Sequence, residues 1–311
     1  MLITHGACAA VLPAVALTIG NFDGIHRGHQ AMIGHLGGEA RRRGFKSCVL
    51  TFEPHPREFF SPQTAPTRLA SLREKCELLA AHGVDRLHVQ RFDAPFAALS
   101  PEVFVERVLA DRLRARWILV GEDFRFGSRR AGDLALLRNL GGRFGYEVQA
   151  MPTVMHAGAR VSSSTVRAAL AAGNLAGAEA LLGRPYGISG RVIHGRKLGR
   201  ELGFATANVQ LKHNRPPLTG IYAVRVHGIG AGARPAVASL GVRPTVTASG
   251  RAVLEVHLFD FSDDLYGVHV RVEFLHKIRD EEKYPDLETL KTQIARDCEA
   301  ARSLLLESRD V

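Results

Sequence analysis

The sequence predicts an α/β domain built on a parallel sheet, followed by a mainly antiparallel β-barrel domain with a C-terminal helix. A chain of 311 residues is about twice the usual length of a domain. In the first half, apolar runs alternate with helical segments, which is typical of a parallel sheet with helical crossovers. Beyond Gly183-Arg184-Pro185, short alternating strands punctuated by glycine and proline replace that pattern. We therefore expect domains over residues 1–184 and 185–311.

The first half opens with an apolar segment, Ala7–Ile19, which we interpret as a buried strand. It lacks a basic leader and runs straight into a turn, so we expect no signal peptide and a cytoplasmic protein. Strands and helices then alternate, with glycine stops and a serine–proline start as helix signals. The expected strands are Cys48–Phe52, Leu87–Val89, Trp117–Val120 and Val148–Met151, and the expected helices are His29–Arg43, Ser71–His82, one starting at Ser100, and Asp133–Phe144.

The second half is predicted to be mostly β structure. Two short helices, near Ser164–Ala172 and Leu175–Leu182, precede the change of pattern. The short strands that follow are typical of an antiparallel barrel or sandwich. They are expected at Gly187–Ile193, Ile221–Val226, Ala236–Leu240, Val253–Phe259 and Val268–Phe274. A last amphipathic helix is expected over Asp286–Glu307, because its leucines and isoleucine recur at helical spacing.

Composition excludes several classes of protein. Hydrophobic residues make up 46% and charged residues 23% of the chain, which excludes a disordered, collagen-like or coiled-coil protein. No stretch approaches the roughly 18 apolar residues of a membrane span. The cysteines are far apart and form no CxxC pair, against a zinc site or disulfide scaffold. The net charge of +10 suits nucleic acid, an anionic membrane, polyphosphate substrates or simply a solvated basic surface.

The sharpest local motif lies between a predicted strand and a predicted helix. It reads Gly20-Asn21-Phe22-Asp23-Gly24-Ile25-His26-Arg27-Gly28-His29. The N-terminus of the following helix presents free N–H groups and a positive dipole end, which favour a phosphate group. Two imidazoles there can donate hydrogen bonds to phosphate oxygens and stabilise developing charge. A lone HxGH is more often a turn with incidental histidines, but the strand before it, the helix after it and the glycines on either side favour a functional site.

This motif resembles the HxGH signature of nucleotidyltransferases, and the longer string resembles the adenylyltransferase half of bacterial bifunctional riboflavin kinase/FAD synthetases. Further segments are similar to motifs of that family, in the same order along the chain. They are Thr51-Phe52-Glu53-Pro54-His55-Pro56, Val120-Gly121-Glu122-Asp123-Phe124-Arg125-Phe126-Gly127, and Val161-Ser162-Ser163-Ser164 with Arg167. Two departures are that Ser164 stands where the family usually has threonine, and Thr165 where arginine is common.

The resemblance implies two groups of site residues in the first half. ATP and its phosphates would be bound by Gly20, Phe22, Asp23, Gly24, His26, Gly28, His29, Ser162, Ser163, Ser164 and Arg167. A loop toward flavin and nucleotide would contain Asn21, Asp123, Phe124 and Phe126. Serine hydroxyls at a helix start with an arginine in the first turn also suit a polyphosphate on physical grounds. Taken alone, Asp123 could equally be a turn residue, and the serines a cap.

The second half carries a glycine-rich basic segment, Gly190–Phe204, followed by Ala205-Thr206-Ala207-Asn208. The latter resembles the PTAN motif of riboflavin kinases, with alanine in place of proline. The resemblance implies ATP binding by Gly195, Arg196, Gly199, Gly203, Thr206 and Asn208. Thr206 and Asn208 supply neutral oxygens suited to Mg²⁺ and phosphate. The basic segment by itself would be interpreted as a surface loop.

Glu255 matches the base proposed for the kinase family, within Leu254–Phe261 and ahead of Asp264-Leu265-Tyr266-Gly267. A carboxylate near an alcohol can accept its proton as a phosphoryl group moves. An outward-facing glutamate in an ion pair is the alternative. Gly241-Val242-Arg243-Pro244-Thr245 also matches the family, and we interpret it as a wall or turn.

The sequence leaves three candidate functions for this protein. The first is a bifunctional enzyme with ATP, riboflavin and FMN as substrates and Mg²⁺ as cofactor: riboflavin is phosphorylated to FMN, which is then adenylylated to FAD with release of pyrophosphate. In this enzyme Glu255, His26 and His29 would be catalytic. The second keeps only one of these activities. The third is a basic nucleic-acid binder, which no RNP motif, aromatic stripe or lysine-rich arm supports. We expect neither a nucleic-acid nor a membrane partner, and the sequence does not predict an oligomeric state.

Overall fold

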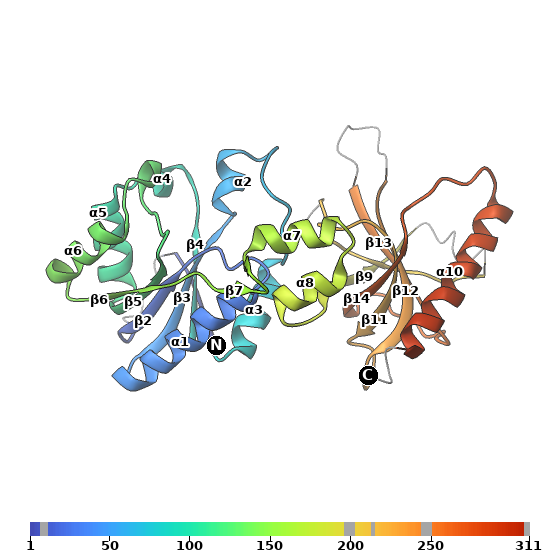
Figure 1. Cartoon of the computed structure of the whole chain (residues 1–311), viewed down its shortest axis with the longest axis horizontal. Helices are drawn as coiled ribbons and strands as arrows, with labels where there is room; N and C mark the ends of the chain where they lie inside the picture. Colours follow the sequence, from blue (N-terminus) through green and yellow to red (C-terminus); the bar gives the residue numbers. More distant parts are fainter. Residues whose placement is uncertain (7–11, 196–202, 213–214, 244–250, 308–311) are drawn as a thin grey trace. The chain divides into compact units, whose positions relative to one another are not determined.

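The computed structural model describes residues 1–6, 12–195, 203–212, 215–243 and 251–307 (Figure 1). The chain divides into two compact units. The first consists of Met1–Pro66 and Leu72–Ser162, and the second of Thr67–Ser71 and Ser163–Val311. Each unit has its own hydrophobic interior.

The first unit is built on a six-stranded sheet in the order β1-β4-β3-β2-β5-β6. All of its strand pairs are parallel. The strands are β1 (Leu2–His5), β2 (Val15–Ile19), β3 (Lys46–Glu53), β4 (Arg86–Arg91), β5 (Ala115–Gly121) and β6 (Glu147–Met151). Because the chain proceeds from β2 to β3 on one side and reaches β5 on the other, the strand order reverses between β2 and β5. Parallel sheets bind ligands at such a reversal, beyond the carboxyl ends of the strands.

Helices cover both faces of this sheet (Figure 1). One apolar layer joins the sheet to α1 (Arg27–Arg43) and α3 (Leu72–Ala81). The other joins it to α5 (Pro101–Phe104), which continues as the π-helical η1 (Val105–Arg112), and to α6 (Leu134–Phe144). The smaller elements are α2 (Pro56–Phe60), α4 (Ala94–Ala97), η2 (Ser128–Arg130), and a hairpin of β7 (Met155–His156) and β8 (Ala159–Arg160).

The second unit is a closed barrel in the order β10-β13-β12-β11-β14-β9. Its strands pair antiparallel throughout. They are β9 (Tyr186–Ile193), β10 (Ala207–Val209), β11 (Gly220–His227), β12 (Arg234–Arg243), β13 (Arg251–Leu258) and β14 (His269–Arg279). Side chains alternate between a buried interior and an outer face, as the two-residue period of a strand requires. Because the barrel is closed, each of its described strands has a neighbour on both sides.

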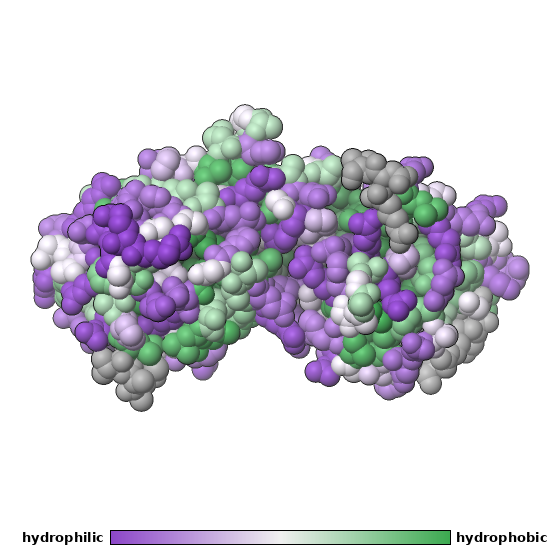
Figure 2. Space-filling model, turned by 90° about the horizontal axis from the view of Figure 1, so that it is seen from below, coloured by the Kyte–Doolittle hydropathy of each residue, from purple (hydrophilic) through white to green (hydrophobic). Residues whose placement is uncertain are grey.

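Among its described residues, the second unit has three helices in addition to the barrel. Apolar side chains of α7 (Ser163–Ala171) and α8 (Leu175–Leu182) belong to the same cluster as the barrel interior. The long α10 (Leu287–Glu307) packs Cys298, Ala301 and Leu305 on outward-facing residues of the barrel. Among the described residues, no helix is long and apolar enough to cross a membrane. On the face shown in Figure 2, hydrophilic residues predominate and smaller hydrophobic areas lie between them.

The predicted fold class is confirmed, with local differences. Of the strand expected over Ala7–Ile19, Val15–Ile19 is observed, residues 12–14 are not part of it, and residues 7–11 lie outside the described residues. Pro13 precedes the observed strand, and proline cannot donate to a strand ladder. The strands β1 and β10 and the β7–β8 hairpin were not predicted from the sequence. These strands are two to four residues long. Because α7 and α8 pack with the barrel, the compact units divide at Ser162, ahead of the change of pattern near Arg184.

A buried histidine on β4 makes the stability of the first unit depend on pH. His88 is fully buried, and its Nδ1 lies 2.9 Å from the Thr4 hydroxyl. Burial, with the charges of Arg86 and Arg112, lowers the pKa of His88 to about 4. The unfolded chain takes up this proton near pH 6.5. The folded form is therefore destabilised as the pH falls from about 6.5 toward 4.

We predict that, between pH 8 and pH 5, this group removes about 2 kcal/mol from the free energy of unfolding. Urea unfolding at both pH values would show it, as a smaller pH effect in His88→Gln than in the unmodified protein. His156→Gln, at an exposed position, is the control. Equal pH effects in the two variants would contradict the prediction.

Candidate active sites

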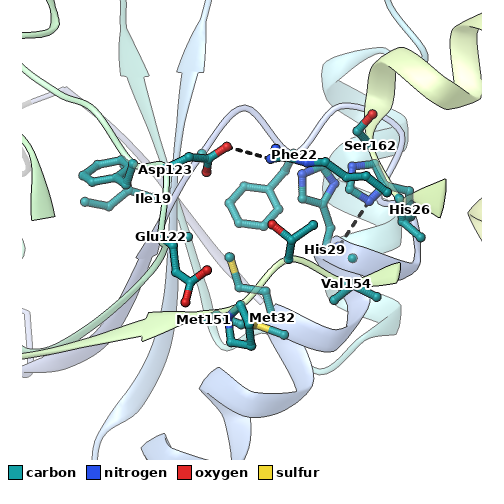
Figure 3. Close-up of a pocket in the computed structure, with 18 residues that line it drawn as sticks. Ile19, Phe22, His26, His29, Met32, Glu122, Asp123, Met151, Val154 and Ser162 are labelled. Atoms are coloured by element: carbon teal, nitrogen blue, oxygen red, sulfur yellow. Dashed lines mark hydrogen bonds and ion pairs between the residues drawn. The ribbon is translucent and has the colours of Figure 1, made fainter. Parts of the chain in front are cut away.

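A pocket of about 240 Å³ lies where the strand order of the first unit reverses (Figure 3). Its walls come from the ends of β2, β5 and β6, the start of α1, and the segment that leads through β8 to Ser162. Of the predicted site residues, it brings together Gly20, Phe22, His26, Gly28, His29, Asp123, Phe124 and Ser162. Gly20 and Ser162, 142 positions apart in the sequence, thus meet at one sheet edge. The predicted parallel sheet places ligands at this edge.

The turn between β2 and α1 has an unusual backbone. Phe22, Gly24 and Ile25 have φ angles of 47°, 83° and 42°. Left-handed conformations are costly for the two residues with side chains and persist only where the surroundings hold them. Both side chains are buried, with 1% and 0% exposure, so apolar packing holds the turn. The buried Asp23 lies within the same turn.

Two histidines stand at the N-terminus of α1. His26 is the N-cap, and its Nδ1 accepts a hydrogen bond from the His29 N–H at 3.3 Å. The two rings stack with centroids 3.7 Å apart. Figure 3 shows both side chains beside the pocket. A Cβ at Gly28 would lie 3.2 Å from two atoms of the His26 ring. Glycine at that position therefore keeps the ring in place and leaves the helix start open toward the pocket.

His29 is held in the neutral form. Burial, followed by the charges of His26 and Lys75, lowers its pKa well below the usual value. Its Nδ1 is buried without a hydrogen-bond partner among the described residues. A neutral imidazole can still donate one hydrogen bond to a phosphate oxygen. A bound polyanion would offset the positive surroundings that now oppose protonation.

An ion pair closes one side of the pocket. Arg160 on β8 lies 2.6 Å from the Asp123 carboxylate, and this pair holds the pKa of Asp123 below its usual value. Arg160 is not among the site residues predicted from the sequence. Its position two residues ahead of the serine cluster could have drawn attention to it, because guanidinium groups bind phosphate well. Met32 and Met151 also line the pocket and were not foreseen.

The other predicted residues of the first half lie elsewhere. Phe126 is in the core and stacks on Phe124, with ring centroids 5.5 Å apart. The Asn21 carbonyl accepts a hydrogen bond from the Thr51 hydroxyl. Ser163, Ser164 and Arg167 belong to α7 in the second unit. There the Arg167 Nε donates to the Thr67 carbonyl at 2.5 Å.

In the barrel, the structure brings Asn208 and Glu255 together. They are directly opposite one another on the paired strands β10 and β13. Directly opposed side chains lie on the same face, with Cβ atoms about 5 Å apart. Their neighbours Val209, Leu254 and Val256 belong to the interior cluster, so Asn208 and Glu255 lie on the outer face.

The remaining kinase residues are described in part. A Cβ at Gly195 would overlap the Asn208 side chain, so glycine there lets the two segments approach. Gly203 has a φ of 89°. Thr206 directly precedes β10, and its neighbour Ala205 offers its carbonyl to the His257 Nδ1 at 2.9 Å. Arg196 and Gly199 lie outside the described residues.

The fold and the two sites define a class of protein. Its first unit is an α/β unit like that of nucleotidyltransferases, and the barrel that follows carries Asn208 and Glu255 side by side on its outer face. Family models agree with both parts. The model for FAD synthetase matches residues 9–165, and that for riboflavin kinase matches residues 182–305. The chain belongs to the family of bifunctional riboflavin kinase/FMN adenylyltransferases. It is a transferase with both activities.

Similar proteins cover nearly the whole chain. The bifunctional riboflavin kinase/FMN adenylyltransferase of Escherichia coli K12 is 48% identical over 96% of this chain and 95% of that protein. The enzyme of the same name from Pseudomonas fluorescens is 49% identical over 98% of this chain and 95% of its own length. A crystal structure described as a macrolide-efflux protein from Streptococcus pneumoniae has 30% identity and a TM-score of 0.81, covering 97% of this chain and 99% of that one.

The stacked histidines yield a prediction for one of the two activities. His29→Ala should lower the rate of FAD formation from FMN by about a hundredfold, the usual cost of one lost donor to developing charge. FMN formation from riboflavin should be unchanged. Both rates follow from separation of the flavin products. His35→Ala, at an exposed position of the same helix, is the control. Equal loss of both activities would assign His29 a structural role.

Proposed function

We propose that residues 1–184 carry the adenylyl transfer and residues 185–311 the phosphorylation of riboflavin. The observation that supports the first assignment best is the histidine pair at the strand-order reversal. For the second it is the opposition of Asn208 and Glu255 on the barrel. Both reactions consume ATP, and a cytoplasmic location is part of this proposal.

In the kinase reaction, Glu255 would act as the base. The 5′-hydroxyl of riboflavin attacks the γ-phosphorus of ATP, a new P–O bond forms, the bond to the bridging oxygen breaks, and ADP leaves. The hydroxyl proton passes to the Glu255 carboxylate. In such transfers the protein forms no covalent bond to the phosphoryl group. It acts mainly by positioning the substrates and by neutralising charge. The segment with Gly195, Arg196, Gly199 and Gly203 would bind the ATP phosphates.

Mg²⁺ would be held by Thr206 and Asn208 together with substrate phosphates. Among the described residues, no group of three or more His, Cys, Asp or Glu side chains could hold a metal. Thr206 and Asn208, the proposed metal ligands near Glu255, instead offer neutral oxygens. This set fits Mg²⁺, which commonly keeps several waters and binds through substrate phosphates with few protein ligands. Bound there, the ion would neutralise charge on the phosphates.

In the adenylyl transfer, an FMN phosphate oxygen attacks the α-phosphorus of ATP and pyrophosphate leaves. His26 and His29 would donate hydrogen bonds to the phosphate oxygens as charge develops. Gly20, Phe22, Asp23, Gly24 and Gly28 would shape the turn that receives the nucleotide. Ser162, Ser163, Ser164 and Arg167 are proposed to bind the triphosphate, and Asn21, Asp123, Phe124 and Phe126 to form the loop toward flavin and nucleotide.

Glu255 provides the test of the kinase assignment. Glu255→Gln keeps the size of the side chain and removes the proton acceptor. The turnover of riboflavin should fall by roughly 10² to 10⁴. Adenylylation of supplied FMN should be unchanged, because that chemistry is assigned to the other half of the chain.

The matched control is Glu273→Gln, which alters another outward-facing glutamate of the barrel. Glu273 pairs with His227 at 2.8 Å on the paired strands β14 and β11, as the ion-pair alternative for Glu255 would require. Near-normal FMN production by Glu255→Gln would favour that alternative, and the kinase would then need a different base.

A further inference from the structure

The polar row formed by Asn208 and Glu255 on the barrel extends beyond Glu255. Ser239 on β12 lies directly opposite Glu255, on the side away from Asn208. Its chain neighbours Ala238 and Leu240 belong to the interior cluster, so Ser239 shares the outer face. Asn208, Glu255 and Ser239 therefore form one line across three neighbouring strands, in that order.

A second carboxylate lies at the end of this line. Glu281 belongs to the segment between β14 and α10, and its Oε1 accepts a hydrogen bond from the Ser239 hydroxyl at 3.2 Å. A Cβ at Gly241, two residues along the same face of β12, would overlap the Glu281 carboxylate. The carboxylate is thus seated on β12, where glycine leaves room for it, and Glu281 is exposed.

A partly buried ion pair fixes the start of this segment. The guanidinium of Arg279, the last residue of β14, donates to both carboxylate oxygens of Asp297 on α10, at 2.9 and 2.6 Å. Asp297 is 4% exposed and also accepts from Gln293 at 3.0 Å. Bidentate charged pairs of this kind stabilise the contact and also restrict the relative orientation of the two side chains. Glu281, two residues beyond Arg279, therefore leaves the barrel from a fixed point.

The order of the polar groups along this line indicates which part of a substrate would lie next to each of them. If metal and phosphate occupy the Asn208 end and the reacting hydroxyl lies at Glu255, the remainder of the alcohol extends toward Ser239 and Glu281. In riboflavin, the carbons next to the reacting hydroxyl carry secondary hydroxyls. Hydroxyls are donors that a carboxylate accepts strongly.

We propose that Glu281 is a substrate-binding residue of the kinase site that accepts hydrogen bonds from the secondary hydroxyls of the ribityl chain. Ser239 is its positioning residue. Together they make the kinase selective for a flavin with a polyol chain. A site built to hydrogen-bond a hydroxyl discriminates strongly against analogues that lack it. This inference rests on the proposed role of Glu255 as the base.

The experiment compares riboflavin with an analogue in which a hydroxypentyl chain replaces the ribityl chain. This analogue keeps the ring and the terminal alcohol and lacks the secondary hydroxyls. In Glu281→Ala, the KM for riboflavin should rise about tenfold, as expected for lost hydrogen bonds to a charged acceptor. The KM for ATP and the inhibition constant of the analogue should be unchanged. Glu281→Gln, which keeps one acceptor oxygen, should recover part of the loss, and Ser239→Ala should raise the KM for riboflavin less than Glu281→Ala.

Glu282→Gln is the matched control, because Glu282 is the exposed neighbour whose carboxylate accepts from Tyr284 instead. It should leave all constants unchanged. The unchanged KM for ATP, measured in the same kinase reaction, reports on the integrity of the barrel in each variant. An unchanged KM for riboflavin in Glu281→Ala, or equal weakening of riboflavin and the analogue, would overturn the inference. If Glu255→Gln abolishes turnover while Glu281→Ala has no effect, only the role of Glu281 fails; if Glu255→Gln retains turnover, the proposed base fails first.

Discussion

Parallel pairing of β2 with β5 is the constraint on which the first unit depends. These strands are neighbours in the sheet, yet the chain builds β3, β4 and their helices before it returns to β5. Their carboxyl ends therefore release two separate loops at the same edge. One loop becomes the histidine-bearing turn into α1, and the other carries Asp123. The pocket follows from the topology, and its side chains give it chemistry.

In the barrel, the pairing register of the strands determines where the site residues lie. A shift of one residue between β10, β13 and β12 would turn Asn208, Glu255 and Ser239 into the apolar interior. The interior cluster on both sides of each residue makes such a shift costly. The same packing that stabilises the barrel thus aligns three polar groups on its outer face. The ion pair of Arg279 with Asp297 adds Glu281 to that line by holding the end of β14 against α10.

Much of this could be predicted from the sequence, because long elements carry periodic signals. The helix predicted over Asp286–Glu307 is observed as Leu287–Glu307, and the HxGH turn lies between a strand and a helix as expected. Short elements such as β10, with three residues, carry no period to detect. Arg160 and Glu281 could not be found in this way, since their partners Asp123 and Ser239 are distant in sequence and meet only through the fold. Family resemblance supplied the role expected for Glu255, which its strand pattern alone left open.

The central claim is that each half of the chain carries one reaction and that FMN made by one site can be used by another. Mixing His29→Ala with Glu255→Gln tests it most directly. Riboflavin, ATP and Mg²⁺ are supplied, and FAD is measured over time. The account predicts that each variant alone makes little FAD from riboflavin, while the mixture makes it readily, because one variant supplies FMN and the other adenylylates it. A mixture that makes no more FAD than the separate variants, although each retains its other activity, would contradict the account.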